Sequence, residues 1–372
     1  MLVCALAGAA CGGEGGPVNG VAAPTSIVEA AALPASSSTT RPCQPAPLEA
    51  RAATVLAVGI NDATTADAPL AASVAALGVG GVILLGPNIR DAAQTRTLIA
   101  GLRQRSPRRL LLAVDEEGGR VSRLRPILGS TPSARILGQQ TLADIATVAA
   151  ERGRVLRDLG FDLALAPVVD ADGGPAGGAV GDRAFATTPA QAGPRAAAFA
   201  EGLRRAGVAA TAKHFPGQGE LPDSHDGQVV SNTPLADLRT AATAGFGPVV
   251  EAGVGAVMMS HVTFRSLGPL PASLEPAAYR LLRSLGFGGV AITDAVGMEA
   301  IIGQWSLPEA TVLALKAGAD LVLATPGDKA VVMRDAVVAA VTDGRLPESR
   351  LDEAVGRVLM LQGEDPAAMV CR

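Results

Sequence analysis

The thirteen residues from Lys213 to His225 carry the side chains best suited to chemistry. They include Lys213, His214, Asp223 and His225, and therefore two of the three histidines of the 372-residue chain. Cations, a carboxylate and two imidazoles in one short stretch favour a functional site over unrelated surface residues. The apolar run 208–212 predicts a strand that ends at Lys213 and His214, and the glycines and prolines that follow predict a long functional loop.

The elements that must position this loop follow a repeated pattern. Six times, a helical stretch ends at a glycine and an apolar run follows it, as in 77–85 and 317–324. Glycine readily adopts the positive φ with which many helices end. Together with the apolar runs 54–58 and 110–114, the pattern predicts eight strands. Each run is continuously apolar, which is typical of parallel strands covered on both faces.

Eight parallel strands separated by helices predict an α/β fold, a single (β/α)8 TIM barrel over residues 48–372. A doubly wound sheet is disfavoured because no Gly-rich nucleotide-binding loop follows the first strand, and the Gly-rich run 173–181 lacks a dinucleotide fingerprint. Active sites of TIM barrels lie where the strands end. Polar residues follow five of the predicted strands. They are Asp115 after the third strand, Asp170, Asp182 and Arg183 after the fourth, Lys213 and His214 after the fifth, Ser260 and His261 after the sixth, and Asp294 after the seventh.

Asp294 and His225 fit the two roles that hydrolysis of an acetal requires. Asp294 is the candidate nucleophile, although an Asp at a strand end could also cap the next helix. His225 can donate a proton near neutral pH, and Asp223 could hold its other ring nitrogen. Glu220 on the same loop remains an alternative acid, since most glycosidases use a carboxylic acid for this step.

Further polar residues at the predicted barrel mouth suit a sugar ligand, because they offer charged and directional hydrogen bonds. The candidate sugar-binding residues are Asp115, Arg123, Arg183, Lys213 and His214. A purely structural role fits His261 best among the histidines, and we expect it in the pocket wall. The histidines lack the short spacing of a zinc site, so we expect neither a metal nor a cofactor.

Six motifs in the right order closely resemble the family-three glycoside hydrolases of the bacterial β-N-acetylglucosaminidase type. They are 114–123 (VDEEGGRVSR), 166–170 (APVVD), 181–185 (GDRAF), 213–217 (KHFPG), 223–225 (DSH) and 292–298 (ITDAVGM). The resemblance implies a retaining mechanism through a covalent glycosyl-enzyme, with Asp294 as nucleophile, His225 as acid/base and Asp223 as its partner. It also implies that the five candidate sugar-binding residues bind the terminal N-acetylglucosamine.

Three positions depart from the pattern of this family. Gln218 stands where many relatives have His, Ala295 where many have a second Asp, and Glu116 where Gln is frequent. None of these changes removes a proposed catalytic group, but they leave open a different pH optimum or different loop motion.

The N-terminal region predicts export. Residues 1–11 resemble a lipoprotein-like export signal in which Cys11 carries the lipid, and 12–47 predict a flexible linker; a short disordered N-terminus is the alternative. Cys43 and Cys371 are expected to form a disulfide, with two free thiols as the alternative. The net charge of -4 and the aromatic content of 2% disfavour a nucleic-acid partner.

The sequence therefore predicts an exported, monomeric enzyme, either secreted or anchored to the cell membrane, that removes non-reducing terminal N-acetylglucosamine from peptidoglycan fragments. Within enzymes of sugars, a β-glycosidase or a glycoside phosphorylase of broader specificity remains open. Two alternatives belong to other classes: an aldolase barrel in which Lys213 forms a Schiff base, and a glycan-binding lipoprotein without catalytic activity.

Overall fold

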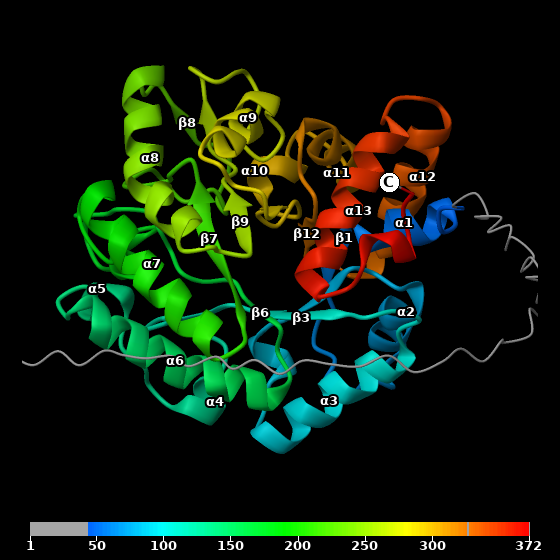
Figure 1. Cartoon of the computed structure of the whole chain (residues 1–372), viewed down its shortest axis with the longest axis horizontal. Coiled ribbons are helices and arrows are strands. Elements are labelled where there is room, and N and C mark those ends of the chain that lie inside the picture. Colours follow the sequence, from blue (N-terminus) through cyan, green and yellow to red (C-terminus); the bar gives the residue numbers. More distant parts are fainter. Residues whose placement is uncertain (1–43, 326, 372) are drawn as a thin grey trace, which may run out of the picture. The chain divides into compact units, whose positions relative to one another are not determined.

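The computed structural model describes residues 44–325 and 327–371 (Figure 1). Within these residues, eight parallel strands form one sheet that follows the order of the chain, and helices surround it. A parallel bridge between Ile292 and Leu321 joins the last two strands and closes the sheet into a barrel. The predicted single (β/α)8 TIM barrel is confirmed.

The strands of the barrel are short, and each is buried along most or all of its length. They are β1 (Leu56–Gly59), β2 (Gly81–Leu84), β3 (Leu111–Val114), β6 (Leu163–Ala164), β7 (Ala209–Phe215), β9 (Ala256–Met259), β11 (Val290–Thr293) and β12 (Val322–Ala324). Two small sheets lie outside the barrel and escaped prediction: antiparallel β4 (Glu116–Gly118) with β5 (Val121–Ser122), and parallel β8 (Val230–Ser231) with β10 (Thr263–Phe264).

Helices connect the strands. The longer ones are α1 (Leu48–Thr54), α2 (Pro69–Leu77), α3 (Ala92–Arg105), α6 (Leu142–Leu159), α7 (Pro189–Arg205), α8 (Leu235–Glu251), α9 (Pro276–Ser284), α11 (Leu307–Ala317), α12 (Ala330–Thr342) and α13 (Glu348–Gln362). Shorter turns are α4 (Arg125–Leu128), α5 (Ala134–Leu137), α10 (Glu299–Ile302), η1 (Gly86–Asn88), η2 (Gly181–Arg183), η3 (Gly327–Lys329) and η4 (Pro366–Ala368). The glycine of each repeated unit has the expected positive φ, for example 101° at Gly160 after α6.

Three predicted strand boundaries differ from the structure. Thr54, expected in the first strand, is the last residue of α1, where its hydroxyl donates to the carbonyl of Ala50. The fourth strand keeps only Leu163 and Ala164. The fifth strand, β7, continues to Phe215, because the polar side chains of Lys213 and His214 find buried partners inside the barrel.

Apolar side chains fill the barrel on both faces of its sheet. In β1, Leu56 and Val58 pack against the surrounding helices, whereas Ala57 points into the interior. The interior cluster consists of Ala57, Ile83, Ala113, Leu163, Leu165, Ala256, Met258, Val290, Ile292, Leu321, Leu323 and Val358. The last of these belongs to α13, which therefore covers the N-terminal end of the barrel and leaves the other end for a site.

The two ends of the described chain lie together. The amide of Ala46 donates to the carbonyl of Met369 at 2.9 Å. Cys371 is disulfide-bonded, but Cys43 lies outside the described residues, so the Cys43–Cys371 pairing stays a prediction. The predicted export signal 1–11 with Cys11 and most of the predicted linker 12–47 also lie outside them.

Candidate active site

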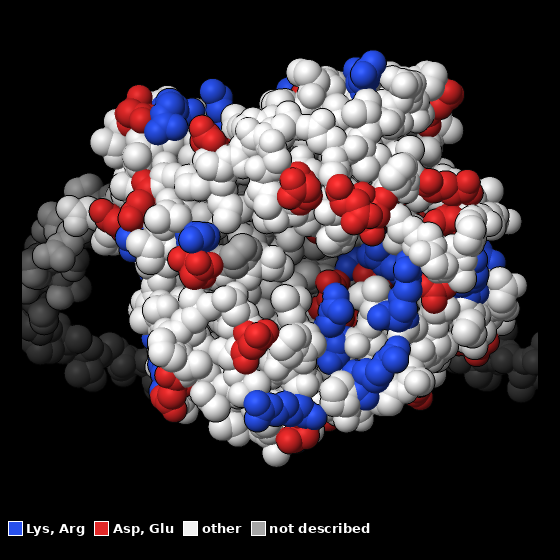
Figure 2. Space-filling model, turned by 180° about the vertical axis from the view of Figure 1, so that it is seen from behind, with Lys and Arg blue, Asp and Glu red and all other residues white. Residues whose placement is uncertain are grey.

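A cavity of about 270 Å³ opens at the C-terminal ends of the barrel strands. Its apolar lining includes four residues of the interior cluster: Ile83, Leu165, Met258 and Leu323. The eight candidate site residues all line it: Asp115, Arg123, Arg183, Lys213, His214, Asp223, His225 and Asp294. Figure 2 shows a hollow edged by Lys and Arg side chains with carboxylates inside it, in agreement with this mixed lining. The structure therefore brings together residues that are far apart in the sequence.

Lys213 is the centre of a charge network on one side of the cavity. Its Nζ lies 2.6 Å from Oδ1 of Asp115 and 2.7 Å from Oε1 of Glu117, and its side chain is only 3% exposed. Burial alone would lower the pKa of Lys213, but the two carboxylates outweigh this effect and raise it. Lys213 is therefore a protonated hydrogen-bond donor, which disfavours a Schiff-base role because that chemistry requires a neutral amine.

Glu117 is the functional residue that sequence reasoning missed. It accepts hydrogen bonds from Nε and Nη2 of Arg183 at 2.7 and 2.9 Å, in addition to its contact with Lys213. Burial acts to raise the pKa of Glu117, yet the charges of Lys213 and Arg183 hold it well below its usual value. The signal for Glu117 was a run of three acidic residues, 115–117, after the third strand. Only the structure shows that the first and the third of them turn towards Lys213.

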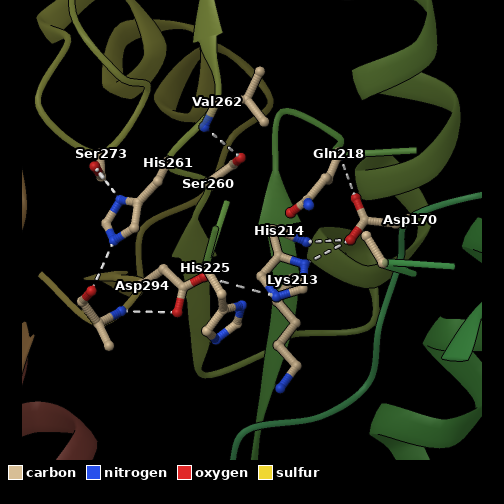
Figure 3. Close-up of polar contacts among 12 residues, drawn as sticks. Asp170, Lys213, His214, Gln218, His225, Ser260, His261, Val262, Ser273 and Asp294 are labelled. Atoms are coloured by element: carbon tan, nitrogen blue, oxygen red, sulfur yellow. Dashed lines mark hydrogen bonds and ion pairs between the residues drawn. The ribbon is translucent and has the colours of Figure 1, made fainter. Parts of the chain in front are cut away.

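His214, the residue after Lys213 in β7, lies between Asp170 and Asp294. Its Nδ1 lies 2.6 Å from Oδ2 of Asp170, which also accepts the backbone amide of His214 at 3.0 Å. Its Nε2 lies 4.0 Å from Oδ2 of Asp294 (Figure 3). Asp170 was noted at a strand end but was not among the candidate site residues; it is almost completely buried and fixes the orientation of the His214 ring.

Asp294 follows β11 and faces the same cavity. Its amide donates to the carbonyl of Met259, and its Oδ1 accepts the amide of Ala295 at 2.8 Å. Burial would raise the pKa of Asp294, but the nearby His214, the Ala295 amide and Lys213 lower it below its usual value. The carboxylate is therefore ionised at neutral pH, as a nucleophile requires.

Asp223 and His225 lie on the loop after β7, at the edge of the cavity. Oδ1 of Asp223 accepts both the backbone amide of His225 at 2.9 Å and its ring Nδ1 at 2.7 Å. Nδ1 therefore carries a proton, and Nε2 is the ring atom available for proton transfer. The side chain of His225 is 67% exposed, so it is not enclosed by the protein in this structure.

Glu220, the alternative acid, lies apart from this cavity. It lines a neighbouring cavity behind the loop, and its Oε1 accepts the amide of Gly173 at 3.0 Å. This contact joins the His225 loop to the Gly-rich loop 173–181. The geometry thus favours His225 over Glu220 as a proton donor to a ligand beside Asp294.

The expectation that His261 forms part of the pocket wall is wrong. The residue does not line the cavity; it is 1% exposed, and its ring lies between the hydroxyl of Ser273 and the carbonyl of Ala295. Sequence reasoning placed it correctly after the sixth strand but could not show that its ring would turn towards the carbonyl of Ala295.

Among residues 44–325 and 327–371, no three or more His, Cys, Asp and Glu side chains are grouped to hold a metal ion. In the same part of the chain, none of the helices has the length and apolar character that crossing a bilayer requires.

The chain is similar in sequence to known proteins. Residues 48–361 match the sequence model described as "Glycosyl hydrolase family 3 N terminal domain". The chain is 39% identical over 329 residues to the β-hexosaminidase LpqI of Mycobacterium tuberculosis, which covers 84% of this chain and 82% of that protein. It is 37% identical over 255 residues to a β-hexosaminidase of Stenotrophomonas maltophilia, which covers 66% of this chain and 76% of that protein.

Solved structures agree with these matches. A β-N-acetylglucosaminidase from Paenibacillus superposes with a TM-score of 0.81 at 32% identity. The match covers 88% of this chain and 64% of the Paenibacillus chain, so this chain spans less than two thirds of that relative. The structure of LpqI from M. tuberculosis superposes with a TM-score of 0.77 at 35% identity and covers 86% of this chain and 94% of that chain.

Proposed function

Because the chain belongs to glycosyl hydrolase family 3, we propose that it is a retaining exo-β-N-acetylglucosaminidase that acts on peptidoglycan fragments. The resemblance of its six motifs to this family is thereby confirmed. One observation carries the proposal: the ionised carboxylate of Asp294 and the imidazole of His225 line the same cavity as a network of buried charges suited to sugar hydroxyls. The names of the relatives, β-hexosaminidase and β-N-acetylglucosaminidase, support the choice of sugar.

The first half of the proposed reaction forms a covalent glycosyl-enzyme. An oxygen of Asp294 bonds to the anomeric carbon, and the bond from that carbon to the glycosidic oxygen breaks with its electron pair on the oxygen. Nε2 of His225 donates a proton to this oxygen, so that the leaving group departs as a neutral alcohol. Asp223 stabilises the protonated ring through Nδ1.

The second half returns the enzyme to its starting state. His225, now neutral, takes a proton from a water molecule whose oxygen bonds to the anomeric carbon, and the bond to Asp294 breaks. Two displacements at the same carbon retain the configuration of the sugar.

The exposed position of His225 implies that its loop moves towards a bound sugar. Gly217 and Gly219 are the proposed hinges, since their φ angles are 134° and 59° and no side chain crowds either position. The proposed ligands of the terminal N-acetylglucosamine are the other residues of the cavity named above: Asp115, Arg123, Arg183, Lys213 and His214. Arg183 and Lys213 are already held by buried Glu117, and His214 by buried Asp170, which reduces the entropy lost on binding.

The test compares an aryl β-N-acetylglucosaminide with the aryl β-glucoside at matched concentrations, and follows the anomer released first by NMR. We expect hydrolysis of the first substrate, little of the second, and initial release of the β-anomer. Equal turnover of both substrates would indicate a β-glycosidase of broader specificity. Formation of a sugar 1-phosphate in phosphate buffer would indicate a phosphorylase. Initial release of the α-anomer would contradict retention.

We further propose that the enzyme is exported and anchored through a lipid on Cys11. Part of the support is the apolar segment 1–11, which ends in small residues. Metabolic labelling with a radioactive fatty acid should mark the wild-type chain and not the Cys11→Ala variant; labelling of both variants, or of neither, contradicts the proposal.

A further inference from the structure

Both ring nitrogens of His261 have a partner from a different segment. Nδ1 lies 2.7 Å from the hydroxyl of Ser273, and Nε2 lies 3.0 Å from the carbonyl oxygen of Ala295. A carbonyl only accepts, so Nε2 carries the proton and Nδ1 accepts from the Ser273 hydroxyl. Burial also lowers the pKa of His261, although Asp294 and the bond to Ala295 oppose this effect, which agrees with a neutral ring.

Ser273 gives the ring a rigid support. Its amide donates to the carbonyl of Ser260 at 2.9 Å, and its own carbonyl accepts the hydroxyl of Tyr279 at 2.6 Å. With the bond to His261, these contacts hold Ser273 at three of its polar groups. The ring of His261 is thus anchored on the side facing away from Ala295.

Ala295 joins the ring to the carboxylate of Asp294. Its amide donates to Oδ1 of Asp294 at 2.8 Å, and its carbonyl accepts from His261. The next amide, of Val296, donates to the carbonyl of Leu323 at 2.9 Å. The orientation of Ala295, whose amide binds Oδ1 of Asp294, is therefore set on one side by the bond from Val296 to Leu323 of β12 and on the other by His261.

We infer that His261 is a positioning residue for Asp294, since it holds the Ala295 carbonyl and thereby fixes the amide that orients the carboxylate. The inference rests on the proposed role of Asp294 as nucleophile. His261 makes no contact with the cavity, so its effect should fall on the rate of the chemical step and not on the affinity for the sugar.

A matched pair of variants separates the two hydrogen bonds of the ring. The amide nitrogen of a glutamine lies near the position of Nε2, so His261→Gln can still donate to Ala295. The shorter asparagine reaches the position of Nδ1, so His261→Asn keeps the contact with Ser273 and loses the one with Ala295. The assay is kcat and KM on the aryl β-N-acetylglucosaminide, with Tm as a control for folding.

We expect kcat of His261→Asn to fall about 10²-fold, the usual effect of a small misplacement of a reacting group, while KM stays within about twofold. His261→Gln should stay within about tenfold of the wild type. Equal losses in the two variants, or a loss expressed in KM alone, would overturn the inference. If His261→Asn does not fold, Ser273→Ala is used in its place, because this variant keeps the ring of His261 but removes the hydroxyl that supports the ring. A lowered kcat of Ser273→Ala at constant KM supports the inference, and an unchanged kcat overturns the inference. A wild-type enzyme inactive on this substrate would instead refute the proposed function.

Discussion

Replacing Glu117 with glutamine tests whether the buried charge network holds the sugar-binding side of the cavity. The substitution keeps the shape of the side chain but removes the charge that lies between Lys213 and Arg183. Lys213 retains Asp115 at 2.6 Å, whereas the ion pair of Arg183 with Glu117 is lost. We therefore expect a less stable protein and a higher KM for the aryl β-N-acetylglucosaminide.

The magnitude follows from the burial of the pair. The side chains of Glu117 and Lys213 are 4% and 3% exposed, and that of Arg183 is 16% exposed. Removing one partner of a buried ion pair costs about 3–5 kcal/mol, and since glutamine still offers one acceptor oxygen we take the lower value of about 3 kcal/mol. For a chain of this size, at about 2 °C per kcal/mol, Tm should fall by about 6 °C.

The stability difference should also depend on pH with a defined sign. The folded protein holds the pKa of Glu117 below its usual value of 4.5, so the unfolded chain binds this proton more readily. The stabilisation from Glu117 is therefore fully present above about pH 4.5 and is lost as pH falls below it. The Tm difference between wild type and Glu117→Gln should be constant from pH 7 to about pH 5 and should shrink at lower pH.

Glu201→Gln is the matched control. Glu201 also pairs with two cations, Arg204 and Arg205, but on the surface of α7, where such pairs contribute little. The measurement is Tm of the three proteins across pH, with KM at pH 7. A Tm loss for Glu117→Gln no larger than that for Glu201→Gln, or a difference that does not change with pH, would refute the reasoning.

Three further outcomes follow from the proposed chemistry and the chain ends. Asp294→Ala should lose about 10³-fold or more in kcat while the protein stays folded, because no glycosyl-enzyme can form; near-normal rates would exclude it as nucleophile. His225→Ala should lose far more activity on a natural disaccharide than on an aryl glycoside with a good leaving group, and Glu220→Ala should show no such contrast; the reverse pattern would assign the acid to Glu220. Thiol labelling of the unreduced, exported protein should leave Cys43 and Cys371 unmodified, whereas labelling of Cys43 would rule out the bridge.

The barrel could be predicted because its strands appear in the sequence as a repeated pattern of apolar runs. Six of the eight apolar runs follow a glycine with positive φ, and parallel strands buried on both faces need no polar alternation. The hairpin of β4 and β5 and the pair of β8 and β10 could not be predicted, since strands of two or three residues carry no periodicity. The rule that barrel chemistry gathers where strands end then placed Asp115, Lys213 and Asp294 in one region.

Partners within the site were harder to predict than its members. Lys213 and His214 were recognised as ligands for a sugar, but their buried counter-charges, Glu117 and Asp170, were not. A carboxylate after a strand is visible in the sequence, whereas the direction in which a loop turns it depends on tertiary packing. His261 shows the same limit, because its role depends on a backbone carbonyl that no sequence pattern marks.

The three departures from the family pattern can now be understood through the atoms that make the contacts. At Ala295 both contacts with the site are made by the backbone amide and carbonyl, so the side chain can change without loss of either. At Gln218 the backbone amide donates to Asp170, and the side chain donates to the carbonyl of Pro222 in the same loop. Glu116 is buried, and this burial raises its pKa despite bonds from Ser122 and Leu124, which brings it closer to the neutral glutamine frequent in relatives. Each departure thus leaves the contacts around Asp294 and His214 intact, and a change in pH optimum or loop motion would have to arise outside those contacts.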